Sequence, residues 1–244
     1  AATRTGHTGR FHVEIDTGMG RSGFDWRRVA EWGPDLADRA SPASVWEGCY
    51  THFHSADLED DGPTRAQWES FNSALKRLEP EKGGLIHSCN AAAAMRYPTF
   101  AADAVRPGIF LYGGCVGKGV APPEEAARVR ARVTLIRDVP ESTTLGYGAT
   151  YCSSGNERWA TLGIGYGDGF PRVLGNRGNA LLAGQKFPII GRISMDMTVV
   201  DITGAGGVEV GDAATLIGTD GDGVITLDEV ADLAGTISYE ILTG

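Results

Sequence analysis

The stretch FHVEIDTGMGRSGFDWRRVAEWGPDLADRA, residues 11–40, decides the fold class. Its first six residues alternate apolar and polar side chains, which is typical of a strand that is buried on one face. The turn-rich residues 17–23 follow, and from residue 24 onward the apolar residues recur at helical spacing. Residues 11–40 therefore predict one strand–loop–helix unit, which is the repeating element of a parallel α/β sheet.

The same pattern recurs along the first half of the chain. Strand-like and helix-like stretches alternate at residues 44–54 and 64–78, at 84–88 and 90–98, and a fourth strand is expected within 103–113. From about Val129 the sequence changes to short β-rich runs that are separated by glycine turns. One helix is expected near the end, at residues 226–235, where Thr226 and Glu229 match a capping box. We therefore expect an α/β domain at residues 1–125 and a mostly β domain at residues 126–244.

Four strand–helix units leave an open sheet with two bare edges and an uncovered apolar face, and further strands would close it, as in an eight-stranded barrel. We therefore expect residues 1–125 to be the C-terminal half of a (β/α)8 TIM-like barrel. The chain starts without Met and stops at residues 238–244, directly after a helix and within an apolar run. Truncation at both ends is the interpretation that these patterns favour.

Composition excludes several classes of protein. A net charge of −9 and a pI near 5.0 make the chain a poor candidate for binding nucleic acid or an anionic membrane. No run of roughly 18 apolar residues is present, which argues against a membrane span. The four cysteines include no close pair, so we expect buried, reduced thiols and a cytoplasmic protein. Glycine is unusually frequent at 35 of 244 residues, which indicates many tight turns.

Two stretches suggest other functions. His52 and His54 lie two residues apart at a strand end, and with His87 they would form the metal site of a barrel hydrolase, although no carboxylate is placed as a further ligand. Residues 218–229 resemble a calcium-binding loop, but Gly218 occupies the first position, where a carboxylate is expected. A metal-dependent hydrolase and a calcium-binding module are therefore the alternatives from other classes.

Seven motifs occur in a fixed order. They are IDTGMGRSGF at 15–24, YTHFHSAD at 50–57, HSCNAAAAMRYP at 87–98, VRPGIFLYG at 105–113, LGYGATY at 145–151, IGYGDGFPR at 164–172 and GRISMDMTVVDI at 191–202. Together they closely resemble the alanine racemase family, whose members depend on pyridoxal phosphate and carry a barrel domain followed by a β domain. The resemblance runs from about residue 10 to residue 244. It implies an isomerase that interconverts L-alanine and D-alanine, and a racemase of serine or another small amino acid is the alternative within the family.

The resemblance also assigns roles. Tyr147 corresponds to the tyrosine that moves the Cα proton on one face of the substrate, and a lysine works on the other face. The cofactor contacts that the resemblance implies are Arg106 at the pyridine nitrogen, His52 beside it, the backbone of Gly108 and Ile109 and the side chain of Tyr239 at the phosphate, and Arg21 at the phenolic oxygen. The substrate contacts that it implies are Arg21, Met195, Tyr166, Arg172 and Arg192. The family joins the barrel of one subunit to Tyr147 and Met195 of another, so a homodimer is implied.

Departures from the family pattern concern three positions. The family's cofactor lysine lies in a motif resembling VKANAYGHG, which is absent here, and none of the lysines, at 76, 82, 118 and 186, is expected at a barrel strand end. We therefore expect this chain alone to be inactive. Ala91 stands where many relatives place a phosphate-binding serine. Glu14 stands where many relatives carry a carbamylated lysine, and we expect its charge to pair with Arg21, the alternative being a solvent-facing glutamate.

Overall fold

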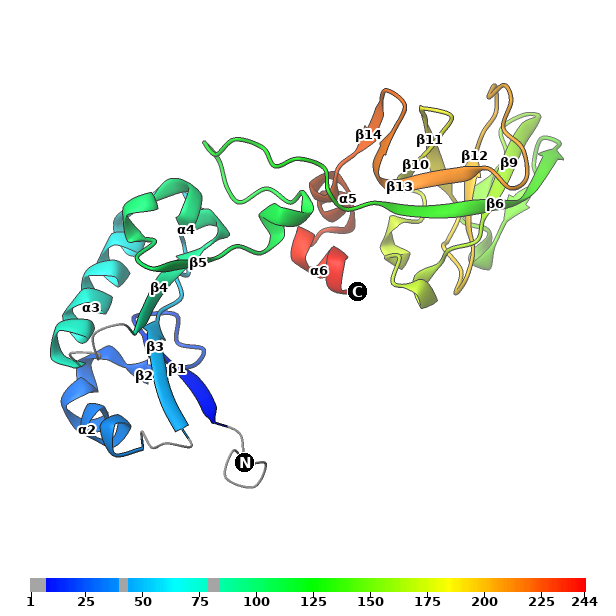
Figure 1. Ribbon diagram of the computed structural model, residues 1–244. Coiled ribbons are helices and arrows are strands. Elements are labelled where there is room, and N and C mark those ends of the chain that lie inside the picture. The colour runs from blue at the N-terminus through cyan, green and yellow to red at the C-terminus, as the bar shows by residue number, and fades with distance from the viewer. Residues whose placement is uncertain (1–7, 40–43, 79–83) are drawn as a thin grey trace. The chain divides into compact units, whose positions relative to one another are not determined.

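The computed structural model describes residues 8–39, 44–78 and 84–244. The chain separates into two compact units, the first formed by residues 1–108 and 116–121 and the second by residues 109–115 and 122–244. Their elements are labelled in Figure 1. The domain boundary between residues 125 and 126 stays a prediction.

The first unit is built on a five-stranded sheet in which every neighbouring pair is parallel. In spatial order its strands are β2 (Phe24–Asp25), β1 (Gly9–Asp16), β3 (Ser44–Tyr50), β4 (Leu85–Asn90) and β5 (Ala104–Arg106). Its helices are α2 (Val29–Arg39), α3 (Gly62–Leu78) and α4 (Ala91–Arg96), with 3₁₀ turns at Trp26–Arg28 and Pro98–Phe100. The predicted parallel α/β architecture of a barrel part is therefore confirmed.

The helices α2 and α3 lie on the same side of β1 and β3 (Figure 1). Because successive strand residues point to opposite faces, Val13 and Ile15 of β1 face these helices and are buried with Phe71 of α3. The intervening residues, His12 and Glu14, point to the other face of the sheet. This second face, which we call the polar face, carries the polar residues described below.

The fourth predicted strand is shorter than expected. Only Ala104–Arg106 pairs with β4, and Ile109–Tyr112 forms a 3₁₀ helix instead of continuing the strand. Pro107 explains the change, because proline has no backbone N–H to donate to the sheet. The strand therefore ends directly at Arg106.

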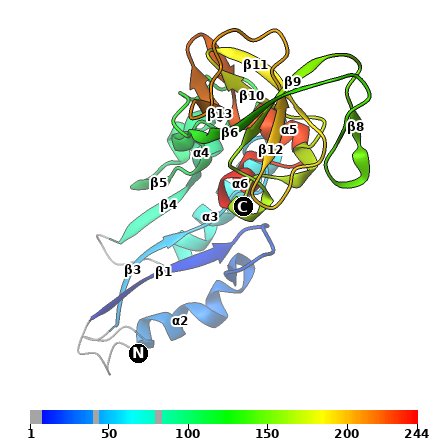
Figure 2. The same cartoon turned by 90° about the vertical axis from the view of Figure 1, so that its right-hand side faces the viewer.

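The second unit is an antiparallel barrel, and the predicted β domain is confirmed. Its strands are β6 (Val129–Val139), β9 (Glu157–Leu162), β10 (Asn179–Leu182), β11 (Gln185–Ile190), β12 (Thr198–Asp201), β13 (Ala213–Asp220) and β14 (Gly223–Ile225). They follow the order β10-β11-β12-β9-β6-β13-β14, and a further pairing of β10 with β13 closes the ring. A separate pair, β7 (Thr144–Leu145) and β8 (Tyr151–Cys152), belongs to a hairpin that projects from the barrel (Figure 2).

Two helices end the second unit, where one was predicted. The expected helix is α5 (Leu227–Ala234), whose Thr226 side chain accepts a hydrogen bond from the Glu229 N–H at 3.0 Å. The Glu229 carboxylate binds Lys186 at 2.9 Å instead of turning back to the helix N-terminus, so half of the predicted capping box forms. The additional helix is α6 (Ser238–Thr243), whose six residues are too few to produce a clear helical period.

None of the helices in the described residues is long and apolar enough to cross a membrane. All four cysteines are free, but the expectation that they are buried holds only for Cys49 and Cys89, because Cys115 and Cys152 are exposed.

Candidate active site

Arg106 is the centre of the polar face. Its Nη1 donates to His87 at Nδ1 (2.7 Å) and at the backbone oxygen (3.2 Å). Its Nη2 lies 2.7 Å from the Thr51 carbonyl oxygen, 3.3 Å from the Ser88 carbonyl oxygen and 3.3 Å from His52 Nδ1. Burial lowers the pKa of Arg106, although a guanidinium stays charged in proteins. These contacts engage the two terminal nitrogens, and no hydrogen bond of the described residues engages Nε–H.

The two histidines beside Arg106 are held neutral. Burial lowers the pKa of His52, and the positive charges of Arg106 and Arg21 lower it further. Burial and the charge of Arg106 lower the pKa of His87 to about 4. A guanidinium only donates hydrogen bonds, so the Nδ1 atoms facing Arg106 accept, and both neutral rings carry their proton on Nε2.

Tyr50 and Glu14 form the next group on the polar face. The Tyr50 ring stacks on His87 with 5.1 Å between centroids, and the Arg106 guanidinium lies 5.1 Å from the Tyr50 ring centroid. The Tyr50 hydroxyl donates to Glu14 Oε2 at 3.1 Å, and Ser22 Oγ donates to the same oxygen at 2.7 Å. Burial and the Glu14 charge raise the pKa of Tyr50.

Glu14 therefore contacts the residue next to Arg21 rather than Arg21 itself. No ion pair within 4.0 Å joins Glu14 to Arg21 among the residues that the structure describes. The charge of Arg21 nevertheless lowers the pKa of both Tyr50 and His52, which places it near the polar face. Glu14 is half-buried, so it is not a solvent-facing glutamate either.

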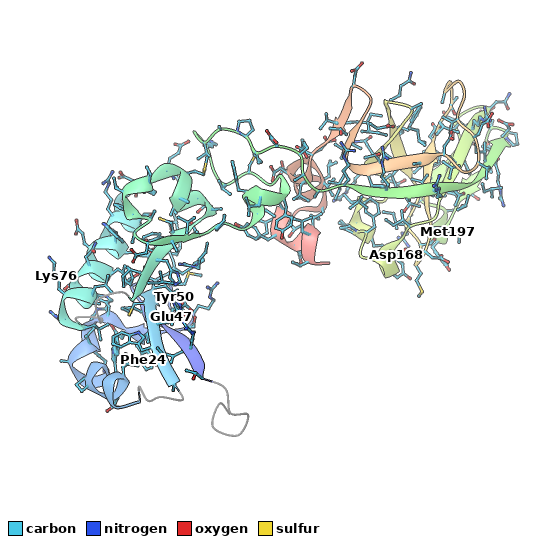
Figure 3. The ribbon with its side chains drawn as sticks, in the orientation of Figure 1. Phe24, Glu47, Tyr50, Lys76, Asp168 and Met197 are labelled. Carbon is cyan, nitrogen blue, oxygen red and sulfur yellow. The ribbon has the colours of Figure 1, made fainter. Side chains whose placement is uncertain are left out.

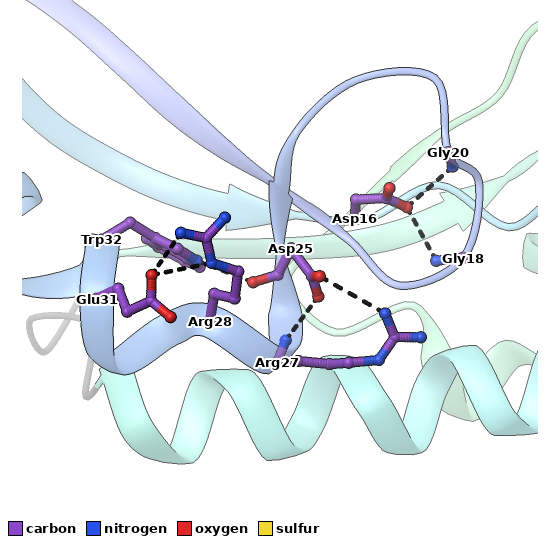
Figure 4. A network of polar contacts seen from close by, with 8 residues as sticks. All are labelled: Asp16, Gly18, Gly20, Asp25, Arg27, Arg28, Glu31 and Trp32. Carbon is purple, nitrogen blue, oxygen red and sulfur yellow. Dashed lines mark hydrogen bonds and ion pairs between the residues drawn. The ribbon is translucent and has the colours of Figure 1, made fainter.

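The loop that carries Arg21 is held at its start by Asp16. Asp16 Oδ1 accepts hydrogen bonds from the N–H groups of Gly18 (2.9 Å) and Gly20 (3.1 Å), as Figure 4 shows. The loop ends at Asp25, whose carboxylate accepts from the N–H of Arg27 at the start of the following helical segment. Arg21 itself is exposed, while hydrogen bonds to Asp16 and Asp25 hold the backbone at the two ends of its loop.

Three polar residues at the C-terminal ends of β1 and β3 and on α3 were not predicted from the sequence: Thr17, Thr51 and Gln67. The hydroxyls of Thr17 and Thr51 lie 2.7 Å apart, and Gln67 Nε2 donates to Thr17 Oγ1 (3.2 Å) and to the His52 carbonyl oxygen (3.0 Å). Gln67 Oε1 accepts from the His54 N–H at 3.0 Å. Gln67 is buried with Thr64, Phe71 and Ala74 on one face of α3. A polar residue at the apolar helical spacing was the signal that would have identified it.

In the second unit, Tyr147 lies in a 3₁₀ turn between two glycines with positive φ, Gly146 at 66° and Gly148 at 73°. Its side chain is 70% exposed. The Arg192 guanidinium lies against this turn, because a Cβ added to Gly148 would be 3.1 Å from Arg192 Nη1. The structure thus brings together Tyr147 and Arg192, two residues that the motifs had placed separately.

Tyr166 and Met195 belong to two loops that are joined through their backbones. The Tyr166 N–H donates to the Ser194 carbonyl oxygen at 3.0 Å, and the Gly167 N–H donates to the Met195 carbonyl oxygen at 2.7 Å. Asp168, labelled in Figure 3, closes the first loop by accepting from the Gly165 N–H. The Met195 side chain is 62% exposed. Tyr166 and Arg172 also line a hollow of about 470 Å³ on this unit.

The residues expected at the phosphate differ in burial. Ile109 is buried and starts the 3₁₀ helix that follows β5, whereas the Tyr239 side chain on α6 is 51% exposed. A Cβ on Gly108 would meet no atom within 4 Å, so the space beside this backbone is open. Ala91 is buried and begins α4, which Asn90 caps by accepting a hydrogen bond from the Ala93 N–H.

The alternative binding sites lack support in the described part of the chain. No group of three or more His, Cys, Asp or Glu side chains there is placed to hold a metal ion. His54 instead contacts Ser55. In the calcium-like stretch, Asp220 accepts from the Gly184 N–H and Glu229 pairs with Lys186.

The three lysines that the structure describes lie away from the polar face. Lys76 lies at the end of α3 (Figure 3), Lys118 pairs with Glu59 and Lys186 pairs with Glu229. Lys82 lies outside the described residues. None of the three described lysines is at the C-terminal end of a strand of the parallel sheet.

Comparison with known proteins gives a consistent result across the whole chain. Residues 1–116 match the family model "Alanine racemase, N-terminal domain", and residues 126–244 match "Alanine racemase, C-terminal domain". The alanine racemase of Carboxydothermus hydrogenoformans is 41% identical over 240 residues, which are 96% of this chain and 64% of that protein. Alanine racemase 2 of Bacillus subtilis is 38% identical, over 95% of this chain and 61% of that protein.

Solved structures agree. The alanine racemase of Bacillus anthracis with bound L-Ala-P has a TM-score of 0.86 and 32% identity, covering 97% of this chain and 62% of that one. The alanine racemase of a D-cycloserine-producing Streptomyces lavendulae has a TM-score of 0.87 at 32% identity, covering 99% of this chain and 65% of that one. This chain thus spans somewhat less than two thirds of the length of the relatives that it matches.

Proposed function

The chain belongs to the alanine racemase family, and from this premise we propose that the whole protein interconverts L-alanine and D-alanine with pyridoxal phosphate as its cofactor. The observation that carries the proposal is the state of Arg106. Five contacts hold its two terminal nitrogens, and no hydrogen bond of the described residues engages its Nε–H. A half-buried donor of this kind fits an acceptor supplied by a ligand.

Arg106 suits the pyridine nitrogen of the cofactor because its guanidinium does not transfer a proton to that nitrogen. When bound, pyridoxal phosphate supplies an electron sink that makes the Cα proton of an amino acid removable. A guanidinium donates hydrogen bonds but does not give up its proton, so Arg106 leaves the pyridine nitrogen unprotonated. Weaker electron withdrawal favours return of the proton to Cα over its transfer to another carbon. Arg106 thereby favours racemisation over transamination.

Tyr147 is the acid–base residue in this proposal. The residue is mostly exposed and lies in a turn between Gly146 and Gly148. The Arg192 guanidinium lies against the same turn, so a positive charge is held beside the proposed acid–base residue. The motif VKANAYGHG, which carries the second base in the family, has no match in these 244 residues.

The remaining proposed residues contact the cofactor or the substrate. Arg21 is proposed to hold the phenolic oxygen and the substrate carboxylate. The Glu14 carboxylate accepts a hydrogen bond from Ser22, the residue next to Arg21, and is proposed to supply a negative charge beside the loop that carries Arg21. Gly108, Ile109 and Tyr239 are proposed at the phosphate. His52 is proposed beside Arg106, and its Nε2–H points away from the guanidinium because Nδ1 accepts from it.

A homodimer is proposed because the exposed site residues of the second unit include apolar surface. Met195 is 62% exposed, Met197 is 46% exposed and Tyr147 is 70% exposed. Side chains of this kind cost free energy when they face water, and methionine and tyrosine are frequent in interfaces between subunits. We propose that a second copy covers them and that Tyr147, Met195, Tyr166, Arg172 and Arg192 act at the cofactor of that copy. A cytoplasmic location is proposed from the four free cysteines.

The test is a racemisation assay with the whole protein. After loading with pyridoxal phosphate, it is incubated with L-alanine in D₂O, and D-alanine and deuterium at Cα are followed by chiral chromatography and mass spectrometry. We expect both to appear together, because the proton at Cα exchanges with solvent during racemisation. The same assay with L-serine is needed to decide the substrate, because an apolar pocket disfavours a substrate with an added hydroxyl by only about 100-fold. Formation of D-alanine without deuterium, or no D-alanine at all, contradicts the proposal.

A further inference from the structure

Behind Arg106, the polar contacts continue across the polar face of the first unit. His87 on β4 accepts from Arg106 at Nδ1, and its other nitrogen, Nε2, lies 2.9 Å from Nδ1 of His12 on β1. His12 Nε2 lies 3.5 Å from Oε2 of Glu47 on β3. The line Arg106–His87–His12–Glu47 therefore takes one residue from each of four strands. We call it the histidine line.

The direction of every proton in the histidine line follows from its first member. Arg106 has no acceptor, so His87 Nδ1 accepts and the neutral His87 ring carries its proton on Nε2. That proton is donated to His12 Nδ1, so the neutral His12 ring also carries its proton on Nε2. His12 Nε2–H then faces the Glu47 carboxylate, which only accepts hydrogen bonds when it is ionised. The line ends at half-exposed residues, since the side chains of His12 and Glu47 are 26% and 29% exposed.

The backbone of the sheet allows this line because of one glycine. Strand β3 lies between β1 and β4, and Gly48 on β3 pairs with His12 on one side and with Leu85 on the other. A Cβ at Gly48 would lie 2.8 Å from His12 Nδ1 and 2.1 Å from the Leu85 carbonyl oxygen. The His12 ring thus crosses β3 at a residue without a side chain. This is how two histidines on strands that are not neighbours come within hydrogen-bond distance.

Other charged groups around the line do not offer a competing arrangement. Tyr50 stacks on the His87 ring and directs its hydroxyl to Glu14, so it contacts His87 by its face alone. Arg10 pairs with the second oxygen of Glu47, at Oε1, and keeps that carboxylate charged: the Arg10 hydrogen bond lowers the pKa of Glu47. The acceptor at the far end of the line is therefore present throughout the neutral pH range.

We propose that His12 is a positioning residue for Arg106: its Nδ1 accepts a hydrogen bond from the Nε2–H of His87 and so holds His87 in the tautomer whose Nδ1 fixes the guanidinium. A proton added to His12 Nδ1 would face the Nε2–H of His87, and two donors repel each other. The line is thus intact only while both rings are neutral. The effect on catalysis rests on the proposed function, whereas the tautomers do not.

The first test needs neither cofactor nor activity. Long-range ¹H–¹⁵N spectra of the 244-residue chain labelled with ¹⁵N-histidine distinguish the two neutral tautomers and the charged ring. At pH 7.5 we expect both His12 and His87 to be neutral with the proton on Nε2. A proton on Nδ1 of either ring, or a charged His12 at this pH, overturns the proposal.

The second test separates the acceptor of His12 from its shape. His12→Asn keeps an acceptor oxygen at the place of Nδ1, whereas His12→Leu has nearly the same shape and no acceptor. We expect the His87 Nε2 proton to exchange with water at a similar rate in the native chain and in His12→Asn, and at least tenfold faster in His12→Leu. Equal exchange rates in the two variants overturn the proposal. His54→Asn, which changes a histidine outside the line, is the matched control.

The same pair tests the consequence in the whole protein. We expect kcat to fall roughly fivefold in His12→Leu, about the worth of one hydrogen bond, with KM changed less than twofold, and His12→Asn to retain most of the native kcat. Variants that are impaired equally would mean that His12 acts by shape, and this overturns the positioning role. If the native protein does not racemise alanine, the proposed function fails, while the tautomers and exchange rates still decide whether the line exists.

Discussion

The polar face of the first unit and the Tyr147 region of the second unit hold their proposed site residues in opposite ways. On the polar face, Arg106 makes five contacts to residues of neighbouring strands and their loops, and its position is fixed by side-chain hydrogen bonds. In the second unit, Tyr147 and Met195 are mostly exposed, and the backbone of their loops is what is fixed. The proposed site residues are therefore packed in the first unit and mostly exposed in the second unit.

The difference predicts which measurement responds to a mutation. Removing a partner from a buried, hydrogen-bonded group leaves other groups unsatisfied, so substitutions at Arg106 lower stability. An exposed side chain has few contacts to lose, so a substitution at Tyr147 changes chemistry and leaves stability nearly unchanged. The predictions below compare the two regions, from the largest expected effect to the smallest.

The largest effect is expected from Tyr147→Phe in the whole protein. Loss of the hydroxyl removes an acid–base group, which contributes typically 10²–10⁴-fold to a rate, and the loss should differ between L- and D-alanine in isotope exchange. The melting temperature should be unchanged. Tyr151→Phe is the matched control from the same hairpin: its hydroxyl donates to the buried Glu157, so it should cost about 1 kcal/mol of stability. A rate loss below about threefold in Tyr147→Phe would contradict its role.

The next effect is expected from Arg106→Lys. A lysine keeps the charge but cannot reach His87, Thr51 and Ser88 together, so the free energy of unfolding of this chain should fall by about 3 kcal/mol. Arg192→Lys is the control from the open region, and because Arg192 is exposed we expect a change of about 0.5 kcal/mol or less. Denaturant titration measures both. Equal losses would mean that the two regions do not differ in packing.

A smaller effect on stability is expected from Gly148→Ala. The left-handed φ of 73° costs an alanine about 1 kcal/mol, and the new methyl group would press on the Arg192 guanidinium. Because Tyr147 precedes it, the rate in the whole protein should fall more than stability does. Gly155→Ala is the control in the same unit, since its Cβ would meet no atom within 4 Å. If both variants keep full activity, the turn does not position Tyr147.

The last prediction concerns the pH dependence of stability, which differs from the stability changes above because it is seen only below neutral pH. His87 has a pKa of about 4 in the folded chain and 6.5 as the ordinary value, so between these pH values the unfolded state binds the proton and the folded state does not. Stability therefore falls as the pH falls from 6.5 to 4. Replacement of His87 by phenylalanine should reduce this slope in thermal unfolding, and replacement of the exposed His54 should not. An unchanged slope in the His87 variant would show that His87 is not held neutral.

The sequence predicted the elements whose patterns are local. Alternation at residues 11–16 predicted β1, helical spacing predicted α2 and α3, and Thr226 marked the start of α5. The motifs predicted Arg106 and Tyr147 as site residues, and the structure places both where strands or turns fix their backbone. The residues around Arg106 and Arg21 were harder to predict from the sequence. Gln67 and Tyr50 were not predicted as site residues, and Glu14 was expected to pair with Arg21 and not with Ser22 and Tyr50.

The amino-acid sequence by itself determined the order of strands and helices, the change to a β unit and the identity of the family, because these depend on side-chain periodicity and on motifs that are read along the chain. Tertiary structure alone decided that β10 pairs with β13 to close the barrel and that the histidine line crosses Gly48. His12 and His87 are 75 positions apart and on strands that are not neighbours. Their contact depends on strand order, register and the missing Cβ between them, and no local pattern encodes these three together.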